Sequence, residues 1–100
     1  MKLRVQESSI TLRLSPEEIQ SLAVSRSLCQ KSVLPGGQLD IRVDASDTED
    51  MAFHYQEGCF AFSIPSVDLE SWANTSKMGY RRNYGDLLVV IEKDLPRRRK

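Results

Sequence analysis

Cationic and aromatic side chains alternate in one short segment of the chain. Arg81 and Arg82 lie between Tyr80 and Tyr84, and this interleaving is typical of surfaces on which single-stranded bases stack. Further basic residues lie near the two ends of the sequence. Together, the candidate contacts for an anion or a nucleic acid are Lys2, Arg4, Arg13, Arg81, Arg82, Arg97 and Arg98.

Each of these basic segments also has an ordinary structural explanation. A solvated loop whose tyrosines fold back over a sheet is the favoured interpretation of residues 80–84. A short basic run at a terminus, here residues 97–100, is more often a disordered solubilising tail than a binding segment. The nucleic-acid interpretation is therefore the second choice.

Three residues could bind a metal ion or act as a nucleophile and its base, namely Cys29, His54 and Cys59. Zinc sites use about four ligands, usually in closely spaced pairs, so three isolated candidates predict neither a metal site nor a cofactor. A hairpin would bring His54 and Cys59 to one face, but no further residue orients the imidazole or stabilises an oxyanion. The sequence predicts no catalytic residue, and an enzyme is the least favoured class of function.

The composition is that of a small globular domain. The 100 residues carry 14 Lys and Arg against 14 Asp and Glu, and a net charge of zero gives no bulk attraction to nucleic acid or to an anionic membrane. We expect one domain over residues 1–95, a basic tail over residues 96–100 and no internal repeat. The longest apolar run, residues 87–91, is far shorter than the ~20 residues that cross a bilayer.

The N-terminus alternates polar and apolar residues and does not look like a signal peptide. We therefore expect a cytoplasmic protein without a membrane partner. In a reducing compartment, Cys29 and Cys59 are expected to be free thiols that behave as small buried hydrophobic residues.

Alternating apolar residues predict a hairpin over residues 1–14. With a two-residue turn at residues 7–8, Val5 faces Ile10 and every apolar residue of both strands lies on one face. A slip of one residue would destroy this match.

The same register creates a like-charge problem on the other face of this hairpin. Lys2 lies opposite Arg13 and near Arg4, and like charges in this position are destabilising. If the last strand lies beside the first, Glu92 and Asp94 can pair with these bases, which is the favoured arrangement. Otherwise the three cations are left for an anionic ligand or an acidic partner.

A helix is predicted from Pro16 to about Arg26. Ser15 is the expected N-cap and Glu18 the expected return partner of a capping box. Its inner face comprises Ile19, Leu22 and Ala23.

A turn and a half-buried strand follow this helix. Residues 35–37 are expected to form a three-residue loop, since a phosphate-binding loop would have to open onto a helix. This loop pairs Lys31 with Ile41, and the strand over residues 38–45 alternates cleanly. Residues 46–50 are expected to be an acidic, solvated and mobile loop.

A second hairpin is predicted over residues 51–64. With a turn at residues 57–58, aromatic side chains face one another across the strands on one side, whereas His54 and Gln56 face solvent. The aromatic residues expected to be buried there are Phe53, Tyr55, Phe60 and Phe62.

The remaining chain predicts a short helix, a loop and a last strand. Ser66 is expected to cap a helix whose inward side chains are Leu69, Trp72 and Ala73. Residues 74–85 show no clear period and are expected to be a long loop, and residues 87–91 are apolar on both faces, as in a central strand. Residues 92–94 should continue into solvent.

The expected fold class is α+β, with a largely antiparallel sheet in the order ββα-ββ-ββ-α-β and two helices packed on it. The segments MKLRVQESSITLRLSPEE, LPGG, FSIPSVDLESWA and LLVVIEKD make the chain resemble a family of small uncharacterised bacterial proteins. In that family the first turn often holds Gly or Asn, and a Cys often follows the last acidic segment. Here Glu7-Ser8 and Leu95-Pro96-Arg97 stand at those places, so the resemblance implies a fold unit but no thiol function and no substrate.

The leading functional hypothesis is a small non-enzymatic binding domain with an unknown protein partner, because folding explains the apolar pattern and no catalytic constellation survives. A weak nucleic-acid or anion-binding protein is the alternative.

Overall fold

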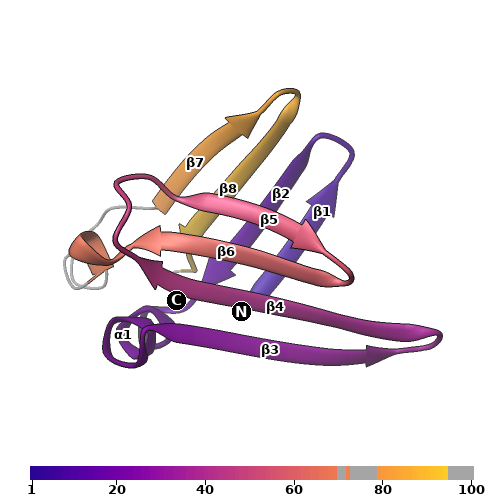
Figure 1. Ribbon diagram of the computed structural model, residues 1–100, viewed down its shortest axis with the longest axis horizontal. Helices are drawn as coiled ribbons and strands as arrows, with labels where there is room; N and C mark the ends of the chain where they lie inside the picture. Colours follow the sequence, from indigo (N-terminus) through magenta and orange to yellow (C-terminus); the bar gives the residue numbers. More distant parts are fainter. Residues whose placement is uncertain (70–71, 73–78, 95–100) are drawn as a thin grey trace, which may run out of the picture.

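A computed structural model describes residues 1–69, 72 and 79–94 of the chain. The elements are β1 (Lys2–Gln6), β2 (Ser9–Leu14), α1 (Pro16–Ser25), β3 (Ser27–Leu34), β4 (Gly37–Ser46), β5 (Ala52–Gln56), β6 (Cys59–Pro65), the 3₁₀-helix η1 (Ser66–Asp68), β7 (Gly79–Tyr84) and β8 (Leu87–Lys93) (Figure 1).

The strands form two four-stranded sheets instead of one. Sheet A has the order β1-β2-β8-β7 and sheet B the order β3-β4-β6-β5. Each sheet consists of two antiparallel hairpins, whose inner strands pair in parallel, β2 with β8 and β4 with β6. The chain is mostly β, with 64% strand and one α-helix in the described part, so the predicted two-helix α+β fold with one largely antiparallel sheet is wrong. Alternation predicts which face of a strand is buried but does not say which hairpins meet.

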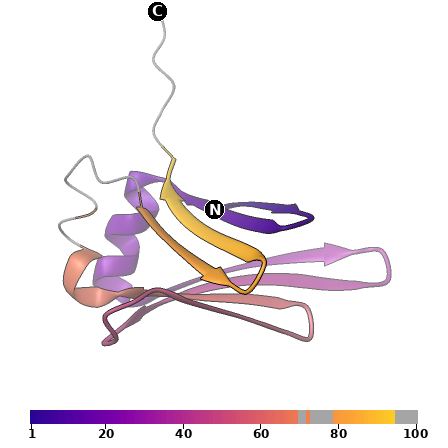
Figure 2. The same ribbon diagram turned by 90° about the horizontal axis from the view of Figure 1, so that it is seen from above.

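The apolar core lies between the two sheets. Figure 2 shows them as separate layers, with α1 and η1 beside one end. Ile19 and Leu22 of α1, together with Leu69 and Trp72, are buried in this core. The strand residues of the buried apolar cluster are Ile10, Leu12, Leu14, Ile41, Val43, Phe62, Ile64, Val89 and Ile91.

The first hairpin and the helix have the predicted local structure. Val5 pairs with Ile10, as expected. The Ser15 Oγ accepts from the Glu18 amide at 3.1 Å, and a Glu18 carboxylate oxygen accepts from the Ser15 amide at 2.9 Å. This capping box is extended by the α-ammonium of Met1, which donates to the other Glu18 oxygen at 2.5 Å and thereby ties the start of β1 to the helix.

The hairpin of β5 and β6 has the predicted register, and one of its burial predictions is wrong. Phe53 pairs with Phe62, and their ring centroids are 5.0 Å apart. Phe62 is 1% exposed but Tyr55 is 54% exposed. Tyr55 lies near the hairpin end, where its hydroxyl accepts from the Gly58 amide at 3.2 Å. His54 and Gln56, the outward residues, are exposed as predicted.

The predicted three-residue loop between β3 and β4 is wrong by one residue. Leu34 pairs with Gly37 across a two-residue turn, in which Gly36 has a φ of 86°. The second residue of this turn is left-handed, a conformation that glycine adopts without a Cβ clash. Lys31 therefore lies opposite Asp40 instead of Ile41, so this cation faces a carboxylate and not an apolar residue.

The C-terminal part of the chain contains more strand than expected. Residues 79–84 form β7 and not a loop, and Tyr80 packs edge-on against Trp72 with centroids 5.2 Å apart. The predicted Ser66 cap is wrong, because Ser66 is the first residue of η1 and the N-cap position is Pro65. Ala73 and residues 74–78 lie outside the described residues.

The last strand is central, as predicted, but it does not turn into solvent at its end. β8 continues through Lys93, which points inward with Val89 and Ile91 and is 4% exposed.

The element boundaries reveal an internal correspondence that the sequence analysis missed. β5 begins 50 residues after β1, at Ala52 and Lys2, and β8 begins 50 residues after β4, at Leu87 and Gly37. Residue n of the first half of the chain, residues 1–50, therefore corresponds to residue n+50 of the second half. The expectation that the chain has no internal repeat is therefore wrong. Each half contributes its first hairpin to one sheet and its second hairpin to the other.

Phe62→Ala should lower the free energy of unfolding by about 3–5 kcal/mol, because a large buried ring leaves a cavity. Tyr55→Ala, in the same hairpin, should lower it by less than about 1.5 kcal/mol because the ring is more than half exposed. Urea denaturation of the two variants measures both values. Similar losses for the two rings would contradict the burial described above.

The charge of Glu18 should stabilise the fold in a pH-dependent way. Burial raises the pKa of this carboxyl, but the hydrogen bonds and charge of the Met1 ammonium and the Ser15 cap outweigh it and leave the pKa below 4.5. A lowered pKa in the folded state means that the stabilisation is present above the unfolded pKa and is lost as the pH falls. The difference in unfolding free energy between wild type and Glu18→Gln should therefore shrink from pH 7 to about pH 3. Glu17→Gln is the matched control, and an equal pH effect there would refute the assignment.

Candidate functional site

The outer face of sheet A gathers four of the basic residues singled out by the sequence. Alternate residues of a strand point to the same face, which brings Lys2 and Arg4 of β1 together with Arg13 of β2. Arg81 of β7 joins them on the far side of β8, where it pairs with Val90. One row of this face therefore reads, strand by strand, Arg4, Thr11, Val90 and Arg81.

Two of these bases form ion pairs with the end of β8. The Lys2 Nζ lies 3.1 Å from an Asp94 oxygen and the Arg13 Nε lies 3.2 Å from a Glu92 oxygen. The favoured structural pairing thus exists, although β8 lies beside β2 and not beside β1. Such partly exposed pairs contribute at most about 1 kcal/mol each, enough to offset the repulsion between Lys2 and Arg13.

The other two bases flank an apolar centre. Arg4 and Arg81 are exposed, and neither has an ion pair with any residue of the described ranges 1–69, 72 and 79–94. Between them lie Val90 and, one row further, Leu88, both half-buried. The four cations outnumber Glu92 and Asp94, so this face carries a positive excess around apolar side chains.

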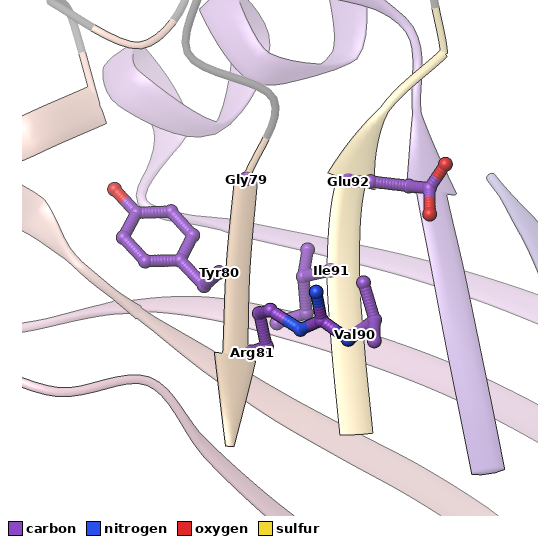
Figure 3. Close-up of a pocket in the computed structure, with 6 residues that line it drawn as sticks. All are labelled: Gly79, Tyr80, Arg81, Val90, Ile91 and Glu92. Carbon is purple, nitrogen blue, oxygen red and sulfur yellow. The ribbon is translucent and has the colours of Figure 1, made fainter. Parts of the chain in front are cut away.

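A hollow of about 280 Å³ opens on this face (Figure 3), and its lining residues are Gly79, Tyr80, Arg81, Val90, Ile91 and Glu92. Gly79 has no side chain to fill the space opposite Glu92, with which it pairs. In Figure 3 the Arg81 side chain reaches from β7 towards Val90 of β8, whereas Glu92 points towards β2. An apolar floor therefore lies between a cation and an anion.

The chain matches the model of a known protein family over nearly its whole length. A family of unknown function, DUF7009, matches residues 1–97. The chain belongs to this family. No curated protein and no solved structure matches the chain. The match agrees with the resemblance to an uncharacterised family and assigns no activity to its members.

Arg82 does not share this face, because it points to the other side of β7. Its Nη1 donates to the Met51 carbonyl at 2.9 Å, and its guanidinium carbon lies 5.1 Å from the Tyr84 ring centroid. The Tyr84 hydroxyl accepts from the Phe53 amide at 2.9 Å. These bonds join the edge strand of sheet A to Met51 and to Phe53 of β5. Residues 80–84 therefore form neither the solvated loop that was favoured nor one continuous basic and aromatic surface. Arg97 and Arg98 lie outside the described residues.

The thiols and the histidine lie on the outer face of sheet B. Cys29 and Cys59 are free, and Cys29 is exposed, so the expectation that both are buried is wrong. The His54 Nε2 is 3.3 Å from the Gln56 side-chain oxygen. Within residues 1–69, 72 and 79–94, no three His, Cys, Asp or Glu side chains form a group that could hold a metal ion.

Among the described residues, no helix is both long and apolar enough to cross a membrane.

The sequence analysis missed the apolar centre of the sheet A face. The feature of the sequence that could have predicted this centre is the apolar run of residues 87–91, which was interpreted as a strand covered on both faces. Val89 and Ile91 are covered, but Leu88 and Val90 face outward. At the corresponding positions of the first half, n−50, sheet B carries the polar residues Gln38 and Asp40.

Gly79 should tolerate no side chain. A Cβ built there would lie 1.9 Å from the Ile91 carbonyl oxygen, and its φ of 153° is unfavourable for other residues. Gly79→Ala should therefore cost at least about 2 kcal/mol of stability. Gly37→Ala, at a strand start with no atom within 4 Å of the new Cβ, should change the urea midpoint little. A Gly79→Ala variant as stable as wild type would show that the backbone here can move apart.

Proposed function

We propose that this chain is a small non-enzymatic protein-interaction domain, and that the outer face of sheet A binds a protein surface that presents carboxylates. The proposal rests on an apolar centre, Leu88 and Val90, with an arginine on either side. Protein interfaces have this arrangement, with a water-excluding apolar centre and arginines that pair with acidic groups at its border.

One observation supports the proposal above the others. The two sheets have the same hairpin arrangement, so sheet B shows what this backbone needs on its outer face. There the central positions are Gln38 and Asp40, and the strand is just as regular. Apolar side chains at the corresponding positions of sheet A are therefore not required by the fold, and a partner that covers them is the physical reason for their presence.

The arginine positions favour a particular spacing of acidic groups. Arg4 and Arg81 lie in one row on the two edge strands of a four-stranded sheet. Three strand spacings separate their backbones by about 14 Å. In an extended peptide that crosses the strands, glutamates four residues apart would span about the same distance. A Glu-x-x-x-Glu segment whose middle residue is apolar is thus the simplest ligand, because residues 1, 3 and 5 of an extended peptide point to the same side.

A nucleic acid fits this face less well. The carboxylates of Glu92 and Asp94 lie among the basic side chains of this face and would repel a phosphate backbone. Arg82 is held at the contact between the two sheets. The cytoplasmic location and the bacterial source that the sequence favours remain part of the proposal.

The test is a titration of ¹⁵N-labelled protein with a synthetic peptide of the sequence Glu-Thr-Leu-Thr-Glu, monitored through the amide signals of the protein. Signals of β1, β2, β7 and β8 should shift, and those of β3–β6 should not. Arg4→Ala combined with Arg81→Ala should weaken binding at least about tenfold, which corresponds to about 1.4 kcal/mol. The control combines His54→Ala with Lys31→Ala. These residues of sheet B correspond to Arg4 and Arg81, and their loss should change the affinity less than about twofold.

The same titration with a lysine-for-glutamate peptide and with a 20-nucleotide single strand separates the alternatives. Binding of the oligonucleotide but not of the acidic peptide, with a steep loss in salt, would replace the proposal by nucleic-acid binding. Equal effects of the two double variants would exclude the outer face of sheet A as the site.

A further inference from the structure

The two halves of the chain match without a gap over their strands and turns. Gln6 and Glu7 recur as Gln56 and Glu57 at the same hairpin turn, and the turn at residues 35–36 corresponds to the turn at residues 85–86. Inward residues correspond in the same way. Examples are Leu3 and Phe53, Ile10 and Phe60, Leu12 and Phe62, and Ile41 and Ile91.

Neither half can complete a sheet by itself. Sheet A combines the first hairpin of the first half with the second hairpin of the second half, and sheet B combines the other two. Each half therefore leaves the inner strand of both its hairpins with one open edge, β2 and β4 in the first half and β6 and β8 in the second. Unpaired inner edges and half-covered apolar faces are unfavourable in water, so each half needs the complementary edges of an equivalent half.

The two parallel strand pairs, β2 with β8 and β4 with β6, differ by two residues in register. Leu12 lies opposite Ile91 in sheet A, whereas its counterpart Phe62 lies opposite Val43 in sheet B and not opposite Ile41. Because side chains alternate with a period of two, this slide keeps the inward residues of each strand on the inner face. The half-to-half surface thus tolerates displacement along the strands while it preserves its core.

We infer that the chain is a fused dimer of two hairpin–helix–hairpin units, and that the surface between its halves can equally be completed by a half from a second copy of this chain. Only the connection from Ser46 of β4 to Ala52 of β5 decides which half is used. Apart from the buried Met51, the residues of this connection are exposed. This inference is independent of the proposed binding face.

The geometry of the connection shows how to force the exchange. β4 and β5 lie on opposite sides of β6, so the connection spans two strand spacings, about 9.6 Å. If residues 47–50 are deleted, only Met51 remains between Ser46 and Ala52, and two Cα steps reach at most about 7.6 Å. The shortened chain cannot cross β6, and its halves must pair with those of a second copy.

The experiment compares the full chain lacking residues 47–50 with a control in which these four residues are replaced by four Gly and Ser residues. Light scattering during gel filtration should give twice the wild-type mass for the deletion and the wild-type mass for the control. Both variants should retain the wild-type far-ultraviolet circular dichroism. A folded monomer, or a deletion variant that is unfolded, would overturn the inference.

A cross-link then shows which chain supplies the second half. Arg42 of β4 lies directly opposite Ala61 of β6, within the range that a disulfide bridges. With Cys29→Ser and Cys59→Ser in the background, oxidised R42C/A61C should be a cross-linked monomer at full length. In the deletion variant it should be a covalent dimer. A deletion variant that forms only the intramolecular bond would contradict exchange, whatever its mass.

Discussion

The parallel pairing of β2 with β8 is the interaction on which the rest of this molecule depends. It joins the two ends of the chain, residues 9–14 and 88–93, and it closes sheet A over the core. Without it, Glu92 would not reach Arg13, and the row from Arg4 to Arg81 would be two separate hairpins. Closing so long a loop costs conformational entropy before any contact is gained. The inward apolar residues of β8 and β2 are buried together in the core, and their burial makes this closure favourable.

Local structure could be predicted from the sequence because the chemistry that determines it is local. The turn at residues 7–8 and the capping box of Ser15 and Glu18 are found as expected, since alternation and cap chemistry each leave one consistent register. The predicted length of the turn at residues 35–37 was wrong, because a Pro-Gly-Gly segment allows loops of two or three residues. Only the shorter loop pairs Lys31 with Asp40. The division into two sheets could not be predicted, because each hairpin is apolar on one face whichever hairpin it joins.

The candidate site could be predicted only in part, for a related reason. Lys2, Arg4 and Arg13 share a face of one hairpin, so their grouping followed from its register. Arg81 reaches this face only because residues 79–84 are a strand, and they have no clear apolar period. The same strand sends Arg82 to the opposite side, where it bonds to the Met51 carbonyl. Two adjacent arginines thus have different roles, one exposed beside Val90 and one structural, and composition alone could not separate them.

An outward-facing apolar centre, even a half-buried one, is an aggregation risk, and the arginines beside it reduce this risk. An arginine can lay its aliphatic stem along apolar atoms while its guanidinium stays in water, and Figure 3 shows Arg81 extended towards Val90. The ion pairs of Lys2 and Arg13 hold two further stems near the same surface. In the free protein the Arg81 stem limits the contact of Val90 with water. A partner carboxylate that pairs with the exposed guanidiniums would leave the stems in place and extend the same apolar surface, so shielding and recognition do not compete on this face.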